Sequence, residues 1–169
     1  MTVVYDTVEE WQAACPWEIF HDRQTGASLP SPPEWEAFTT PETRVVIRHP
    51  EERGAFSANL VLTVERPEEP FAEISAYTEA MVANMSVTLT DLRVLSLDPY
   101  ELWGVQGRRV LSAHRTGPYS VALEQYWFVR DGVATVLSGS CDVADHLGQS
   151  ETFAFAAAGM SVATRLPHE

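Results

Sequence analysis

Lysine is absent from this sequence of 169 residues, and all 11 basic side chains are arginine. Chemistry that needs an amine side chain, such as Schiff-base formation, therefore has no residue to carry it. The 24 acidic residues outnumber the basic ones and give a formal net charge of −13. Because nucleic-acid binding draws on clustered positive charge, this balance argues against a nucleic-acid partner.

Cysteines and long apolar runs are also scarce. The two cysteines, Cys15 and Cys141, lie far apart in the sequence, so two reduced, partly buried thiols are expected instead of a disulfide. No apolar stretch approaches the about 20 residues of a membrane helix. The first residues have neither the basic start nor the apolar stretch of a secretory signal. We therefore expect a cytoplasmic protein that does not insert into a membrane.

The length and the apolar content suit one ordinary domain. A chain of this size buries roughly 70% of its unfolded surface, and 45% of the residues are hydrophobic. Residues 7–10 read Thr-Val-Glu-Glu, a capping box that predicts a helix to Cys15, ended by Pro16. We expect residues 1–16 to form an N-terminal helical extension and residues 17–169 to form a single domain.

Alternating and helical patterns follow along the chain. The helix expected after Pro70 runs to about Met85, with a buried stripe at helical spacing that begins at Phe71. Asp131-Gly132 between two alternating runs is a strong hairpin signal. Strands are expected at residues 17–21, 27–29, 43–49, 56–65, 92–97, 104–115, 119–130 and 133–141, and a closing helix at about 150–163. This order predicts an α+β domain whose mostly antiparallel sheet is covered by the middle and last helices.

Three segments resemble the PsbP-like superfamily. They are Ala27-Ser28-Leu29-Pro30 leading to Trp35, then Phe56-Ser57-Ala58-Asn59-Leu60, then residues 126–137 with the closing Ala/Phe-rich helix. The superfamily includes PsbP, the Ran-binding Mog protein, LpqN-type lipoproteins and the Eag chaperones of type VI secretion. The resemblance covers about residues 19–165. It implies an α/β/α sandwich with a twisted sheet of about six or seven strands, used for binding other proteins, and it implies no enzyme mechanism.

Alternation along residues 119–130 separates two faces of a strand. One face, with Val121, Leu123, Trp127 and Val129, is expected to be the helix-covered core. The other carries Glu124, Tyr126 and Phe128. That composition suits a partly open surface on which aromatic residues anchor a partner. It equally suits a face that the closing helix covers, with Glu124 paired to Arg109.

The charge is distributed unevenly along the chain. Only residues 102–130 are net basic, with four arginines, among them Arg108 and Arg109, against a single Glu124. These arginines either balance the acidic helices of the chain itself or form a site for an anionic partner.

Catalytic patterns are weak. Cys141 with His114 or His146 is the best candidate for a thiol–imidazole pair, against the plainer interpretation of a buried thiol and two ordinary histidines. No ligand spacing typical of a zinc or calcium site occurs, and no glycine-rich phosphate loop is present. We expect no metal, no cofactor and no enzyme activity.

The leading hypothesis is a non-catalytic binding module, with an Eag-like chaperone of a client segment as its sharpest form. Two rivals remain open: a carrier of a small apolar or anionic ligand beside Trp103 and Arg108, and a thiol-dependent hydrolase. A protein partner is expected, and a homodimer is left open. The residues expected to contact the partner are Trp103, Arg108, Arg109, Glu124, Tyr126 and Phe128.

Overall fold

A computed structural model describes residues 3–40, 42–50 and 56–167. Short strands come first along the chain, and four long strands joined by hairpin turns come later. The elements are α1 (Val8–Ala14), β1 (Glu18–His21), β2 (Ser28–Ser31), β3 (Glu36–Phe38), β4 (Val45–Arg48), β5 (Asn59–Glu65), α2 (Ile74–Thr88), β6 (Thr90–Leu102), β7 (Val105–Thr116), β8 (Tyr119–Arg130), β9 (Val133–Asp142), the 3-10 turn η1 (Val143–Asp145) and α3 (His146–Ala158).

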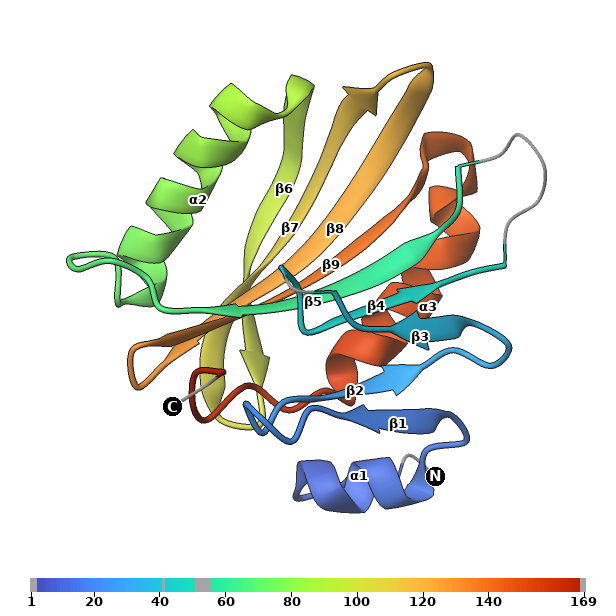
Figure 1. Cartoon of the computed structure of the whole chain (residues 1–169), viewed down its shortest axis with the longest axis vertical. Coiled ribbons are helices and arrows are strands. Elements are labelled where there is room, and N and C mark those ends of the chain that lie inside the picture. Colours follow the sequence, from blue (N-terminus) through green and yellow to red (C-terminus); the bar gives the residue numbers. More distant parts are fainter. Residues whose placement is uncertain (1–2, 41, 51–55, 168–169) are drawn as a thin grey trace.

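Seven strands form one sheet in the order β3-β4-β5-β9-β8-β7-β6, while β1 and β2 pair separately (Figure 1). Every neighbouring pair in the large sheet is antiparallel. The hairpins that join β6 to β9 turn at Gly104, Gly117 and Gly132, each with positive φ, a conformation that glycine adopts without steric cost. These observations confirm the predicted α+β class and its mostly antiparallel sheet.

The two longer helices cover opposite faces of this sheet (Figure 1). On one face, α2 packs Tyr77 and Met85 into a cluster with Trp127 of β8. On the other face, Phe153 of α3 joins a cluster that contains Tyr126 and Phe128. Side chains of a strand alternate between the two faces of a sheet. Trp127 therefore packs in the cluster under α2, and its neighbours Tyr126 and Phe128 pack in the cluster under α3. Among the described residues, no helix is long and apolar enough to span a membrane.

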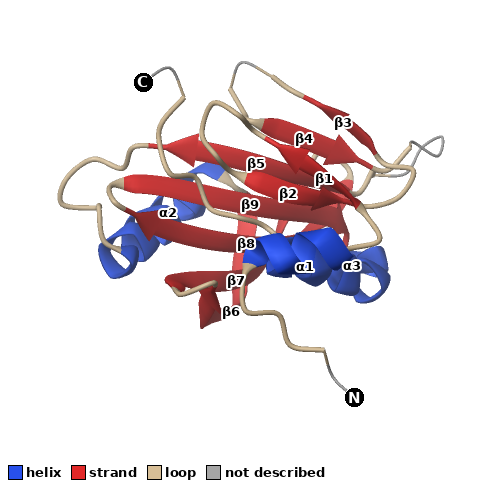
Figure 2. Cartoon of the chain, turned by 90° about the horizontal axis from the view of Figure 1, so that it is seen from below, coloured by secondary structure: helices blue, strands red, loops and turns tan. Residues whose placement is uncertain are grey.

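The first helix lies beside α3, as Figure 2 shows. The Trp11 ring stands 5.0 Å from the Phe155 ring, centroid to centroid. The Gln12 side-chain amide donates to Ser28 Oγ at 2.7 Å and to the Gly159 carbonyl at 2.8 Å. The expected N-terminal extension therefore packs against the C-terminal end of α3 through specific contacts.

Element boundaries differ from the prediction at both helices. The helix expected from Phe71 begins at Ile74, because the Phe71 N–H donates to the Glu68 carbonyl in a turn instead. The closing helix starts at His146, four residues before the predicted Ser150. Its start is prepared by Asp142, whose side chain accepts from the Ala144 N–H at 2.8 Å and caps η1.

Two short strands differ from the prediction. β2 extends the strand expected at residues 27–29 to Pro30 and Ser31, and Pro30 pairs only with Ile19 of β1. A strand with one neighbour tolerates the missing proline donor. The three-residue strand β3 was not predicted, since its pattern is too short to recognise. It forms one edge of the sheet, and β6 forms the other.

Candidate functional site

A buried carboxylate organises the face that α3 covers. Glu124 on β8 is completely buried, and its Oε1 lies 3.1 Å from Arg109 Nε of β7 and accepts from the Tyr126 hydroxyl at 2.5 Å. Its Oε2 lies 3.2 Å from His146 Nε2 and accepts from Ser150 Oγ at 3.3 Å. The carboxylate thus joins β7 and β8 to the start of α3.

The prediction of a partly open surface at Glu124, Tyr126 and Phe128 is wrong. Their exposed fractions are 0%, 1% and 0%, so a partner cannot reach them while α3 is in place. The alternative, a face covered by the closing helix with Glu124 paired to Arg109, is confirmed. Arg109 itself keeps 31% of its side chain exposed.

The network also sets the protonation states of its members. Burial, together with the hydrogen bond to Glu124, raises the pKa of the Tyr126 hydroxyl, which therefore stays protonated and donating. For Arg109, burial acts to lower the pKa, but Tyr126 and Glu124 outweigh it and raise the pKa. Both oxygens of Glu124 have partners, so the cluster acts as an anchor for α3 and leaves no free base.

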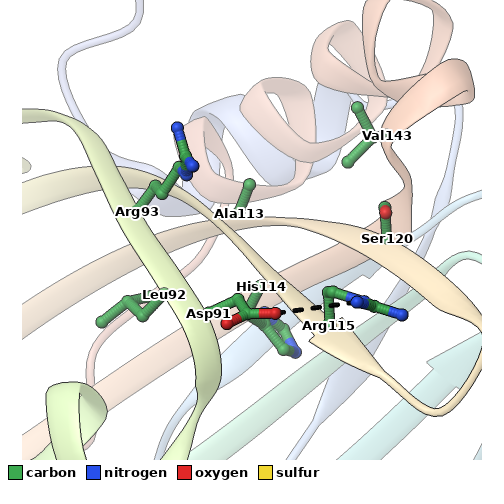
Figure 3. Close-up of a pocket in the computed structure, with 8 residues that line it drawn as sticks. All are labelled: Asp91, Leu92, Arg93, Ala113, His114, Arg115, Ser120 and Val143. Atoms are coloured by element: carbon green, nitrogen blue, oxygen red, sulfur yellow. Dashed lines mark ion pairs between the residues drawn. The ribbon is translucent and has the colours of Figure 1, made fainter.

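A groove opens on the surface beside this anchor (Figure 3). It has a volume of about 680 Å³ and lies where β6 begins and β7 ends, next to η1. Arg93 and Ala113 are paired across β6 and β7, on the face of α3, and Val143 of η1 stands across from them with 46% of its surface exposed. The residues that line the groove are Asp91, Leu92, Arg93, Ala113, His114, Arg115, Ser120 and Val143.

The groove combines apolar and cationic groups. Arg115 pairs only loosely with Asp91, at 3.8 Å, and both side chains are about 60% exposed (60% and 63%), so solvent screens this pair strongly. Burial lowers the pKa of His114, which keeps its ring neutral at pH 7. Two arginines against one aspartate make this region basic within a strongly acidic chain. Such a lining suits a ligand with both apolar and acidic groups.

Trp103 and Arg108, the residues expected beside a small ligand, do not come together. Trp103 lies in the β6–β7 turn with φ of 49° and lines two small hollows, of about 400 and 210 Å³. Arg108 lines neither of them. Its guanidinium instead donates to the Gly107 carbonyl at 2.9 Å and to Ser75 Oγ of α2 at 3.4 Å. Neither of these two hollows is therefore shared by Trp103 and Arg108.

The structure contradicts the expected thiol–imidazole pair of Cys141 and His114. Cys141 is completely buried, and burial, with nearby Asp145 and Asp142, raises the pKa of its thiol to about 11. The strand register places Cys141 opposite Ala122 and Ala122 opposite Ala113. His114 is the next residue after Ala113 and so projects from the other face of the sheet. A thiolate activated by His114 is therefore not available.

The groove itself was not predicted. Four of its lining residues, Ala113, His114, Arg115 and Ser120, lie in residues 102–130, the segment recognised as basic, but Arg115 is the only arginine among these four. Arg93, Ser120 and Val143 come from three separate elements and share no sequence pattern. Within residues 3–40, 42–50 and 56–167, no three His, Cys, Asp or Glu side chains gather in a way that could hold a metal ion.

Comparison with known proteins identifies the fold. No protein-family model and no curated protein matches the chain. Among solved structures, the PsbP protein of the cyanobacterium Synechocystis sp. PCC 6803 (CyanoP) superposes with a TM-score of 0.62 at 13% identity, over 86% of this chain and 91% of that one. LpqN of Mycobacterium tuberculosis, involved in cell envelope biogenesis, superposes with a TM-score of 0.63 at 11% identity, over 93% and 97%.

A third structure, PA94 of Pseudomonas aeruginosa, is a protein of unknown function with a TM-score of 0.61 and 13% identity, covering 90% of this chain and 98% of that one. At such low identities the likeness establishes the fold alone. The three structures support the PsbP-like fold that the sequence resemblance implied. The finer likeness to the Ran-binding Mog protein and to Eag chaperones stays a prediction.

Proposed function

We propose that this protein is a non-catalytic binding module that holds a segment of another protein in the groove beside Val143. The groove itself carries the proposal. Its volume of about 680 Å³ is in the range of about 300–1,000 Å³ that binding sites occupy. It is wide enough for several side chains of a partner.

The lining favours one kind of partner segment. Ala113 and Val143 offer apolar surface, and Arg93 and Arg115 offer positive charge at the rim. A segment that carries apolar side chains next to a carboxylate would satisfy both. The overall charge of −13 would repel acidic proteins that lack the matching apolar contacts, which favours selectivity.

The Glu124 network supports the proposal by holding one wall of the groove in place. Val143 precedes His146 by three residues, and His146 and Ser150 both contact Glu124. The η1 turn is itself capped by Asp142. A wall fixed in this way loses little conformational freedom when a partner binds, which favours affinity.

Within this function, an adaptor or a chaperone of a client segment is the sharper form that we favour. The PsbP-like fold supports it by analogy only, because one fold hosts many functions. An acidic surface would keep the complex with an apolar client in solution.

Site-specific photocrosslinking tests the proposal. A photoreactive phenylalanine analogue replaces Val143 in the source organism, and Phe38 on the far edge of the sheet, 42% exposed against 46% for Val143, serves as the matched control position. We expect one protein to be crosslinked from position 143 and not from position 38. We also expect Arg115→Glu to abolish this crosslink. No adduct at position 143, or the same set of proteins at both positions, would contradict the proposal.

A further inference from the structure

The free edge of β6 carries a cluster of exposed apolar side chains. β6 has 13 residues and is the last strand of the sheet (Figure 1). In the described part of the chain it pairs with β7 alone, so no strand of the chain pairs with its other edge. Val94, Leu95 and Leu97 are exposed by 40%, 63% and 39%. A long apolar edge strand is a template for pairing with another strand.

The register of β6 on β7 fixes the faces of these side chains. Val94 pairs with Ser112, and Leu97 pairs with Val110, which packs in the cluster beneath α2. Val94 and Leu97 therefore both point to the α2 face, although they lie three positions apart in the sequence. The extra residue of the strand is Leu95, because Ser96 already pairs with Leu111. Its side chain has no partner position on β7 and is the most exposed of the three.

Two charges flank this segment on the opposite face. Arg93 pairs in register with Ala113, and Asp98 with Arg109, whose guanidinium reaches Glu124 on the α3 face. In the part of the chain that the structure describes, neither the Arg93 guanidinium nor the Asp98 carboxylate makes an ion pair. The edge thus offers one positive and one negative group, five residues apart.

We propose that β6 pairs antiparallel with β6 of a second copy of this chain, with residues 93–98 of each strand in contact. A two-fold axis between Leu95 and Ser96 places Arg93 opposite Asp98 of the second copy on one face. The same axis places Val94 opposite Leu97 on the other face. Symmetry forms each pair twice, so the edge is complementary to itself.

This register satisfies the groups that the single chain leaves exposed. Both charges gain an opposite charge directly across the strands, and Val94 and Leu97 gain an apolar neighbour, the kinds of pair that stabilise adjacent strands. Leu95 meets the second copy near the axis. Pro99, which has no N–H to donate, lies just beyond the paired segment and ends it. The two seven-stranded sheets would then continue as one.

Sedimentation equilibrium of the whole chain tests the proposal. The monomer has a mass of 18.8 kDa, so the dimer has about twice that mass. We expect Arg93→Glu and Asp98→Arg, made singly, each to raise the dimer dissociation constant about tenfold or more, because like charges then face each other. The double variant with both changes exchanges the two charges and should restore the dimer.

Arg130→Glu, at the start of the exposed β8–β9 turn beside Asp131, changes the net charge as Arg93→Glu does. It is the control for that variant and should leave association unaltered. Thermal unfolding followed by circular dichroism checks that each variant folds.

Two results of sedimentation equilibrium would overturn the proposal: a monomer at all concentrations, or weakened association in the single variants that the double variant does not restore. Hydrogen exchange of the β6 backbone amides gives a further test. If these amides were protected only when a different protein binds, the edge would pair with a strand of that protein, and the dimer proposal would be overturned. Arg93 also lines the groove, whereas Asp98 does not. Asp98→Arg therefore tests the dimer without altering the groove, and Arg115→Glu tests the groove without altering residues 93–98, so the two proposals can fail independently.

Discussion

Arg109 places two guanidinium nitrogens, Nε and Nη2, each 3.1 Å from the same oxygen of Glu124. The two residues come from neighbouring strands, and the carboxylate is fully buried while the arginine is partly exposed. The other oxygen of Glu124 is turned toward α3. The pair therefore connects the sheet to the helix whose start forms the wall of the groove.

Removing the carboxylate tests this connection. Glu124→Ala leaves the Arg109 charge and the Tyr126 hydroxyl without their acceptor. Breaking a fully buried pair costs about 3–5 kcal/mol, and the partial exposure of Arg109 reduces this to about 2–3 kcal/mol. Urea unfolding gives the free energy. The control is Glu36→Ala, which removes the exposed 3.6 Å pair with Arg48 and should cost about 0–1 kcal/mol. Equal losses in the two variants would mean that Glu124 is no anchor.

Two glycines test the packing of α3. A Cβ at Gly139 of β9 would lie 2.6 Å from Phe153 Cγ, whereas at Gly148 of α3 it would meet nothing within 4 Å. Gly139→Ala should therefore destabilise the protein by about 1–3 kcal/mol. Gly148→Ala should stabilise it by about 0.5–1 kcal/mol, since alanine favours a helix. Thermal or urea unfolding measures both, and a tolerated Gly139→Ala would contradict the placement of α3.

The two thiols should differ in reactivity. Cys141 is completely buried and its pKa is raised to about 11, while Cys15 is partly exposed. Because the thiolate is the reactive form, the folded protein at pH 8 should release one equivalent of thionitrobenzoate from Ellman's reagent, and the protein in urea should release two. Rapid reaction of both thiols in the folded state would place Cys141 elsewhere.

The free energy of unfolding should decrease at acidic pH because the Asp22 carboxylate becomes protonated. Burial acts to raise the pKa of this carboxyl, but hydrogen bonds from Arg44, Thr25 and the Gln24 N–H outweigh it and lower the pKa below 3.8. Folding thus favours the ionised form, and its stabilisation is present above pH 3.8 and is lost as the pH falls below that value. Asp22→Asn should cost about 1.5–3 kcal/mol at pH 7 and clearly less at pH 3. A cost independent of pH would exclude the ionised pair with Arg44.

The sequence predicted the parts of the fold that local patterns determine. Alternation located β7, β8 and β9, the Asp131-Gly132 turn located their last hairpin, and the stripe through Met85 located α2. The same alternation divided Tyr126 from Trp127 correctly.

The sequence did not predict which helix covers each face of β8. Whether Glu124 is open or buried depends on where α3 docks, and α3 begins 22 residues after Glu124 in the sequence. The groove was not predicted for the same reason, because Arg93, Ser120 and Val143 are far apart in the sequence and become neighbours only in the folded chain. Local patterns assign a side chain to a face, whereas tertiary packing decides what lies over that face.

Hydrogen–deuterium exchange of the chain with and without its crosslinked partner tests the central claim, that the groove is where another protein is held. We expect partner binding to slow exchange of the backbone amides at residues 91–93, 113–120 and 143–147, which surround the groove, and to leave β3 and β4 unchanged. Protection confined to other elements, or no protection at saturating partner, would contradict the claim.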